Sequence, residues 1–166
     1  MGFSAPAVER AGKTPTRSAT LPRVTTAAWY AEGLRFQCTR CGHCCTGASG
    51  VVRVSEPEIE RLARRLDLGP EQFRAMYTRT LRKGGVSLRE RRGGDCVFYD
   101  RSSGCRVYRD RPLQCRRWPF WPSVVGSARR WREEASGCPG MGAGRLYSEA
   151  EIRVLCRPSA PAPGTS

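Results

Sequence analysis

The stretch FQCTRCGHCC, residues 36–45, contains four cysteines in the pattern C-x-x-C-x-x-C-C. Two cysteines separated by two residues bring both sulfurs to one metal ion, at about 2.3 Å for zinc. A third cysteine at the same spacing reproduces half of the ligand run of an iron–sulfur protein. The side chains of the neighbouring Cys44 and Cys45 leave the backbone in different directions, so this pair suits two sites better than one. The pattern predicts a metal-binding loop.

Five further cysteines follow this loop, and four of them lie in segments typical of ligand loops. Cys96 and Cys105 flank an aromatic strand and a Ser-Ser-Gly turn, which together predict a β-hairpin. Cys138 precedes a proline, as does the last ligand of the bacterial ferredoxin run. Cys156 ends an amphipathic stretch and is expected to pack as a small hydrophobic residue. The remaining candidates number eight, enough for two four-thiolate sites: Cys38, Cys41, Cys44, Cys45, Cys96, Cys105, Cys115 and Cys138.

In this order and context the cysteines resemble those of the YkgJ-type cysteine-cluster proteins, a family of zinc- or iron-chelating CxxCxxCC domains. The resemblance covers roughly residues 35–156. It rests on FQCTRCGHCC at 36–45, GDCVF at 94–98, CRVY at 105–108, RP at 111–112, CR at 115–116, PF at 119–120 and CPG at 138–140. It implies that the eight cysteines chelate metal, without deciding which metal. Met141 departs from the isoleucine that is common at this place in the family.

Two kinds of metal centre fit the cysteine pattern. The tight CG turn at 41–42 suits a zinc knuckle. The third regularly spaced cysteine and the distant Cys-Pro slightly favour a [4Fe–4S] cluster. In that interpretation one site contains Cys38, Cys41, Cys44 and Cys138, and a second site contains Cys45, Cys96, Cys105 and Cys115. The only histidine, His43, is expected to face solvent or to lie beside the ligands rather than to bind metal.

The composition predicts one loop-rich domain for the 166 residues, which include 18 glycines and 12 prolines. A structural metal would then supply about 10 kcal/mol or more of folding free energy in place of apolar burial. The sequence has no apolar run of about 20 residues that would span a membrane, and residues 1–30 lack the apolar core of a secretory signal. We therefore expect a cytoplasmic protein, in which clustered cysteines bind metal more often than they form disulfides.

The net charge of +14 raises the hypothesis of a zinc-stabilised nucleic-acid-binding module. Two sites of four thiolates, each with a net charge of about −2 when zinc is bound, would still leave about +10. Arginines that adjoin cysteines are expected to compensate the sulfur charge: Arg40, Arg106, Arg116 and Arg117. The basic segment RRWR at 129–132 is followed at once by Glu133 and Glu134, so nucleic acid is not the favoured partner.

An enzymatic role is an open alternative, with no catalytic residue identified. Some longer proteins of the resembled family are similar to flagellin lysine methylases that carry an iron–sulfur cluster, which implies a possible protein-modifying activity and a protein partner. The sequence contains no glycine-rich nucleotide loop and no Ser/His/Asp set. Eight thiolates that fill two sites would favour closed coordination over an open catalytic position.

The domain is expected over residues 29–156, between disordered tails at 1–28 and 157–166. Trp29 is expected to begin the ordered part. A strand is predicted at 51–54, followed by a helix that opens with an S-x-x-E capping box at 55–58. Gly69-Pro70 ends this helix, and a second helix is predicted to run on to Gly84-Gly85.

Two residues of the second helix, Met76 and Tyr77, are expected in the core. Val86 to Leu88 form a predicted strand, and Asp110 is expected to cap a helical turn that leads to Cys115.

The aromatic segment WPFW at 118–121 cannot form a regular helix and is expected to cover the metal centre. Trp131 is expected on a strand, and a second capping box at 148–151 opens a last helix. The expected fold is a small, irregular α+β domain organised by metal, with a helical hairpin, a short β-hairpin and a C-terminal helix.

Overall fold

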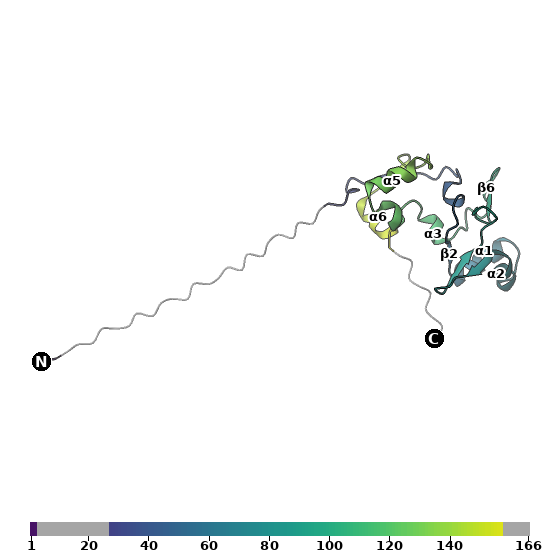
Figure 1. Cartoon of the computed structure of the whole chain (residues 1–166), viewed down its shortest axis with the longest axis horizontal. Coiled ribbons are helices and arrows are strands. Elements are labelled where there is room, and N and C mark those ends of the chain that lie inside the picture. The colour runs from purple at the N-terminus through teal and green to yellow at the C-terminus, as the bar shows by residue number, and fades with distance from the viewer. Residues whose placement is uncertain (3–26, 158–166) are drawn as a thin grey trace.

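The computed structural model describes residues 1–2 and 27–157, so the tails expected at 1–28 and 157–166 lie almost wholly outside the described residues. The expected α+β class is confirmed, because short helices alternate with small antiparallel sheets of two or three strands. Figure 1 shows α5 and α6 on one side of the domain, α1 and α2 on the other, and α3 between them. Among the described residues, no helix has the length and apolar character needed to cross a membrane.

The first side of the domain is built around an aromatic cluster. Its elements are β1 (Leu34–Phe36), β7 (Arg145–Tyr147), α4 (Pro122–Val125), α5 (Ala128–Ala135) and α6 (Glu149–Leu155). Phe120 lies at the centre, with ring centroids 6.1 Å from Phe36, 5.9 Å from Trp131 and 4.6 Å from Tyr147. β1 pairs antiparallel with β7, which brings the chain just before the first cysteine against its C-terminal part. The aromatic cluster is the set of buried residues Phe36, Trp118, Phe120, Val124, Val125, Trp131, Cys138, Met141 and Ile152.

The second side holds the expected helical hairpin and a three-stranded sheet. Its elements are β2 (Arg53–Val54), α1 (Glu56–Arg65), α2 (Pro70–Tyr77), β3 (Thr78–Thr80), β4 (Val86–Leu88), β5 (Tyr99–Asp100) and β6 (Gly104–Cys105). β4 lies between β2 and β3, and β5 pairs with β6 as the expected β-hairpin. Ile59, Leu62, Phe73 and Phe98 are buried between the helices and the sheet. We call this set of buried residues the helical-hairpin cluster.

The second helix is shorter than expected. It ends at Tyr77, and the next three residues form β3, whose Thr78 lies opposite Leu88. Threonines favour strands because their branched side chains fit a pleated sheet, and pairing with β4 outweighs continuation of the helix. Met76 is 53% exposed rather than part of the core, because Phe73 and Tyr77 occupy the inner face of this short helix.

Two further expectations are wrong. Trp131 lies in α5 rather than on a strand, because Ser127 caps a helix at this point by accepting a hydrogen bond from the backbone N–H of Arg130. Asp110 does not cap α3 (Leu113–Arg116), the short helix that carries Cys115. Its carboxylate instead lies 3.5 Å from the Arg65 guanidinium.

Glu58 takes the capping role at α3. One of its carboxylate oxygens accepts a hydrogen bond from the backbone N–H of Leu113 at 2.6 Å, and the other accepts one from Ser55 at 2.8 Å. The expected capping boxes of α1 and α6 are both present. Burial opposes ionisation of Glu58, but the hydrogen bonds outweigh it and lower the pKa of this carboxyl group. Glu58 therefore joins α1 to the helix of Cys115.

We expect Glu58→Gln to lower the free energy of unfolding at pH 7 by about 1–3 kcal/mol, because the amide places a donor against a backbone donor. A carboxyl with a lowered pKa stabilises the fold above its unfolded pKa, and this contribution disappears as the pH falls through the folded pKa. The difference from native should therefore shrink below about pH 4.3. Urea unfolding measures it, with the exposed Glu60→Gln on the same helix as control; equal stability of the two variants at pH 7 contradicts the assignment.

Candidate metal centre

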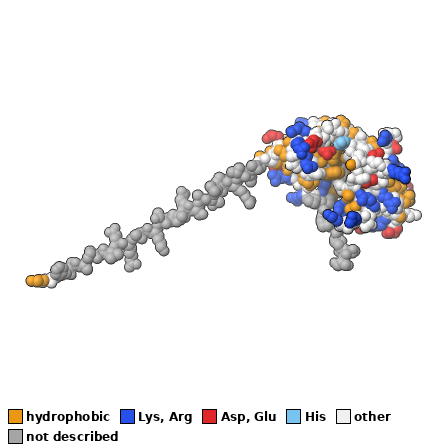
Figure 2. Space-filling model, in the orientation of Figure 1, with side chains coloured by type: hydrophobic (Ala, Val, Ile, Leu, Met, Phe, Trp, Pro, Cys, Tyr) orange, Lys and Arg blue, Asp and Glu red, His pale blue; other side chains and the backbone are white. Residues whose placement is uncertain are grey.

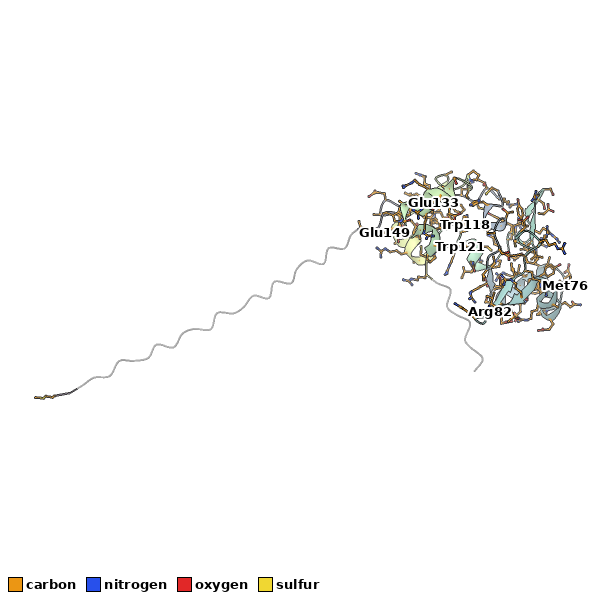
Figure 3. All side chains as sticks on the ribbon, viewed as in Figure 1. Met76, Arg82, Trp118, Trp121, Glu133 and Glu149 are labelled. Carbon is orange, nitrogen blue, oxygen red and sulfur yellow. The ribbon has the colours of Figure 1, made fainter. Side chains whose placement is uncertain are left out.

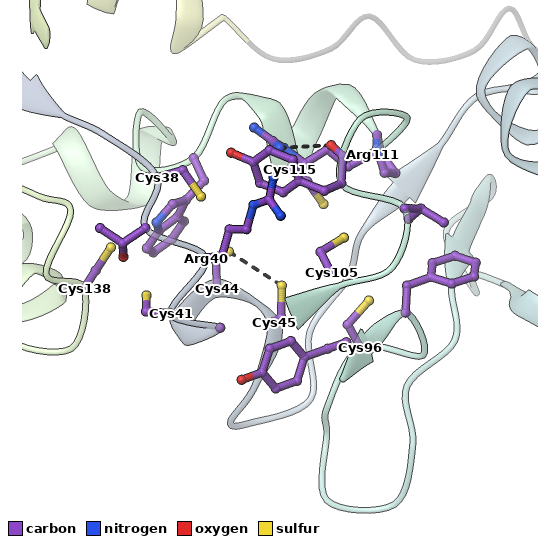
Figure 4. A pocket seen from close by; sticks show the side chains of 18 of the residues that line it. Cys38, Arg40, Cys41, Cys44, Cys45, Cys96, Cys105, Arg111, Cys115 and Cys138 are labelled. Atoms are coloured by element: carbon purple, nitrogen blue, oxygen red, sulfur yellow. Dashed lines mark hydrogen bonds between the residues drawn. The ribbon is translucent and has the colours of Figure 1, made fainter. Parts of the chain in front are cut away.

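The eight cysteines predicted as ligands line one pocket between the aromatic and helical-hairpin clusters (Figure 4). They come from the loop at 38–45, the β-hairpin, α3 and the turn that follows α5. The cavity measures about 60 Å³, well below the roughly 300–1,000 Å³ of sites for organic ligands. Cys156 lies elsewhere, at the end of α6, and packs against the aromatic cluster as expected.

The sulfurs divide into two groups around this pocket (Figure 4). On one side burial raises the pKa of Cys138, and the nearby Cys41 raises it further; Cys38 also lies on this side. On the other side burial raises the pKa of Cys115, and its three neighbours there, Cys45, Cys96 and Cys105, raise it further. Cys44 lies between the groups, with its sulfur 3.8 Å from that of Cys45.

Backbone hydrogen bonds tie the cysteine loop to two distant segments. The N–H of Cys96 donates to the carbonyl of Cys45 at 2.8 Å, and the N–H of Gln37 donates to the carbonyl of Gly140 at 3.0 Å. The second contact requires glycine, because a Cβ on residue 140 would lie 1.9 Å from the Gln37 carbonyl oxygen. These main-chain hydrogen bonds hold the segment of Cys96 and the CPG turn against the loop.

The loop itself turns at Gly42, which has a left-handed φ of 85°. The following residues form the 3₁₀-helix η1 (His43–Cys45), and the N–H of Cys45 donates to the Gly42 carbonyl at 2.7 Å. A side chain at position 42 would also collide with the ring of Tyr99, whose hydroxyl lies 2.2 Å from the position of an added Cβ. The C-G-H turn is therefore a backbone requirement as well as a ligand spacing.

Gln114 positions Cys115 and was missed in the sequence. Its side-chain carbonyl accepts from the N–H of Arg53 at 3.0 Å, and its amide nitrogen donates to the Val51 carbonyl at 2.7 Å. Its own backbone carbonyl accepts from the Trp121 indole at 2.8 Å. Gln114 thus links β2 to the aromatic segment across α3. A polar residue beside a candidate ligand was the only available signal.

The arginines beside the pocket differ from those expected. Arg40 lines it, whereas Arg106, Arg116 and Arg117 are absent from its lining, and Arg117 donates to the carbonyl of Arg157. Arg111 lines the pocket although no cysteine adjoins it in sequence.

Arg40 and Arg111 both stack on Tyr108, with guanidinium carbons 4.2 Å and 3.8 Å from the ring centroid. This stacking holds two positive charges at one wall of the cavity.

His43 lies outside the cysteine pocket. Its Nε2 is 3.0 Å from a carboxylate oxygen of Glu134 on α5, and its ring lies over Gly137. This contact holds η1 against the turn that carries Cys138. A second, more open cavity of about 440 Å³ begins here, lined by His43, Glu134, Trp121 and three of the pocket cysteines, Cys44, Cys45 and Cys96.

Five thiols of the pocket have raised pKa values and are hard to ionise. Burial raises the pKa of Cys96 from 9.0 to about 11 and also raises the pKa values of Cys105, Cys115 and Cys138. The pKa of Cys45 is raised chiefly by its contact with the Cys44 sulfur. The positive charge of Arg111 lowers the pKa values of Cys45, Cys105 and Cys115 in part. A buried group of this kind ionises readily only when a metal replaces its proton.

The pocket fits a sulfur-coordinated metal in its donor type and in its surroundings. Thiols are its main potential ligands, arginines compensate negative charge on one wall, and the buried indole N–H of Trp118 has no hydrogen-bond partner among the described residues. The sulfurs surround the cavity without converging on one point, and within 1–2 and 27–157 no three Cys, His, Asp or Glu side chains are already set to hold an ion. Coordination therefore requires the thiols to lose protons and rotate inward.

Comparisons with known proteins point to a family of metal-chelating domains. The model of the CxxCxxCC family, described as a "putative zinc- or iron-chelating domain", matches residues 37–139, which is more than half of the chain. An uncharacterized protein of Methanocaldococcus jannaschii is 28% identical over 92 residues, covering 55% of this chain and 48% of that protein. The chain thus spans about half the length of this curated relative. No solved structure matches the chain. The family expected from the cysteine pattern is confirmed: the chain belongs to the CxxCxxCC family.

Proposed function

We propose that this protein binds zinc or iron through eight cysteines arranged as two neighbouring four-thiolate sites. The convergence of all eight side chains on one pocket, from segments up to a hundred residues apart, carries this proposal. The first site contains Cys38, Cys41, Cys44 and Cys138, and the second contains Cys45, Cys96, Cys105 and Cys115.

Two thiols of the pocket support this partition. Burial raises the pKa of Cys115, and the three other members of the second site raise it further. Burial also raises the pKa of Cys138, and Cys41 of the first site raises it further. Cys45 is affected most by Cys44 of the first site, so the two sites are neighbours. The sulfurs of Cys44 and Cys45, assigned to different sites, lie 3.8 Å apart, so the two proposed centres would adjoin each other.

A four-iron cluster is slightly favoured over zinc for the first site. The regular spacing of three cysteines and the Cys-Pro at 138–139 match iron–sulfur ligand runs. When bound, a cluster would supply one-electron chemistry, whereas zinc would supply a redox-inert crosslink. The chain's own residues would position the sulfurs, exclude water with Trp118, the one residue of the aromatic segment 118–121 that lines the pocket, and compensate charge with Arg40 and Arg111.

The proposed metal would join the two clusters of the domain. Cys138 belongs to the aromatic cluster and Cys38 packs against it, whereas Cys96 and Cys105 pack against the helical-hairpin cluster. A site that draws ligands from both sides links them more strongly than surface contacts do. A reducing compartment such as the cytoplasm would keep the nine free cysteines available for metal.

A second candidate function is an iron–sulfur-dependent modifying enzyme. The open cavity of about 440 Å³ beside Cys44 and Cys45 favours it, because this volume falls within the range of small-molecule sites. Adding S-adenosylmethionine to the iron-loaded protein should then shift its visible spectrum, and an unchanged spectrum argues against this function.

Nucleic-acid binding receives no comparable support. Figure 2 shows the basic side chains spread over the visible face, with acidic side chains among them, rather than gathered into one stripe.

We expect protein purified without oxygen to contain metal, and Cys138→Ser to remove about half of it by emptying one of two sites. Cys156→Ser is the matched control and should retain the native content, because this sulfur lies outside the pocket. Elemental analysis and the visible spectrum measure the result. Brown protein with iron and sulfide indicates a cluster, and colourless protein with stoichiometric zinc excludes one. Metal content in Cys138→Ser equal to that of Cys156→Ser contradicts the proposal.

We expect metal affinity to rise steeply between pH 6.5 and 8.5, by about tenfold per pH unit for each thiol that loses a proton on binding.

The stability of the metal-free protein should instead fall as the pH rises. Raised thiol pKa values mean that the folded state holds protons that the unfolded state has lost, so its stability should fall from about pH 8.5 up through the folded pKa of about 11 for Cys96. Chelator competition and urea unfolding across this range measure both trends. An affinity independent of pH would show that thiols are not the ligands.

We expect Arg111→Gln to weaken zinc binding at the second site by about fivefold, because a half-exposed charge interaction contributes about 1 kcal/mol. Arg111 acts on three sulfurs of that site, so the first site should keep its affinity. The exposed Arg109→Gln, two residues away, is the control. Competition between zinc-loaded protein and a chelator resolves the two sites, and equal weakening by both variants would point to net charge rather than to Arg111.

A further inference from the structure

One indole of this protein has a buried donor without an acceptor. Trp118 is 7% exposed, and its Nε1–H has no hydrogen-bond partner within the described part of the chain. The indoles of Trp29 and Trp121 instead donate to the carbonyls of Val125 and Gln114, at 2.7 Å and 2.8 Å. Buried N–H groups are normally paired, so the exception at Trp118 needs a physical explanation.

Trp118 lies at the wall of the cysteine pocket. It lines the cavity together with Cys138, and both residues belong to the aromatic cluster. Figure 3 shows Trp118 close to Trp121, whose ring packs edge-on against it with centroids 4.9 Å apart. On another side the His43 ring lies 6.0 Å away. These contacts hold the indole in place beside Cys138.

We propose that the indole N–H of Trp118 donates an N–H···S hydrogen bond to the sulfur of Cys138 once that sulfur is a metal-bound thiolate. This inference rests on the proposed function. A neutral thiol is a weak acceptor, whereas a thiolate is a strong one. The donor therefore finds its full partner only in the metal-bound state. Trp118 is a positioning residue that stabilises one ligand and tunes the electron density of its sulfur.

The ionisation of Cys138 agrees with this geometry. Burial raises the pKa of this thiol, and the Trp118 side chain acts in the opposite direction by favouring the thiolate.

The test compares Trp118→Phe, which removes the N–H and keeps an aromatic ring, with Trp121→Phe, which removes an N–H already paired with a backbone carbonyl. In zinc-loaded protein, Trp118→Phe should weaken the first site about tenfold in chelator competition, with Trp121→Phe near native. Replacing zinc by cobalt should show the sulfur-to-cobalt absorption band shifted in Trp118→Phe alone. If the protein carries a cluster, Trp118→Phe should lower its reduction potential, because a hydrogen bond to sulfur favours the reduced state.

A measurement on the native chain keeps the test valid if Trp118→Phe does not fold. In protein with ¹⁵N-labelled tryptophan, zinc loading should move one indole N–H resonance downfield and slow its exchange with solvent; variants of the other three tryptophans assign it. Failure of the native protein to bind any metal overturns both the proposed function and this inference. Normal metal binding with an unchanged indole resonance, or with Trp118→Phe indistinguishable from Trp121→Phe, overturns the hydrogen bond alone.

Discussion

The structure depends on a junction between two small hydrophobic clusters. The aromatic cluster and the helical-hairpin cluster each bury a handful of large side chains, and the pocket lined by eight cysteines lies between them. Clusters of this size stabilise a fold only weakly by themselves. Their relative position is held by a few hydrogen bonds, notably those of Glu58 and Gln114 to main-chain groups around α3. Any strong interaction within the pocket would therefore stabilise the whole domain.

The pocket has the properties of a site prepared for negative charge on sulfur. Two guanidinium groups stack at its wall, and an indole N–H lacks a partner in the described residues. Both features are of little use around neutral thiols, and both become favourable around thiolates. Burial acts in the opposite direction by raising the pKa of thiols such as Cys96 and Cys115, so these thiols need a metal in order to ionise. Sites that depart from the usual rules of satisfied burial are commonly functional. The membership of the chain in the CxxCxxCC family is consistent with this interpretation.

Local elements of the fold were predictable where local forces decide them. The capping boxes at Ser55 and Ser148 and the β-hairpin before Cys105 follow from short-range hydrogen bonds and turn residues, and all three are present. The second helix was predicted too long because pairing of β3 with β4, two strands joined only in the folded protein, overrides helical spacing. Trp131 was misassigned to a strand because its aromatic side chain favours sheets, while the Ser127 cap favours a helix.

By itself the sequence determined which sulfurs are candidates, because the spacing of ligands in a loop and the glycines around them are local constraints. It also set Cys156 apart, through its place at the end of an amphipathic helix. Only the tertiary structure decided which cysteines are neighbours and which residues surround them. Arg111 and Trp118 line a pocket whose sulfurs are brought together by β1–β7 pairing and by the hydrogen bonds of the cysteine loop to residues 96 and 140. Electrostatic and hydrogen-bond interactions depend on distance in space, which ligand spacing along the chain does not encode.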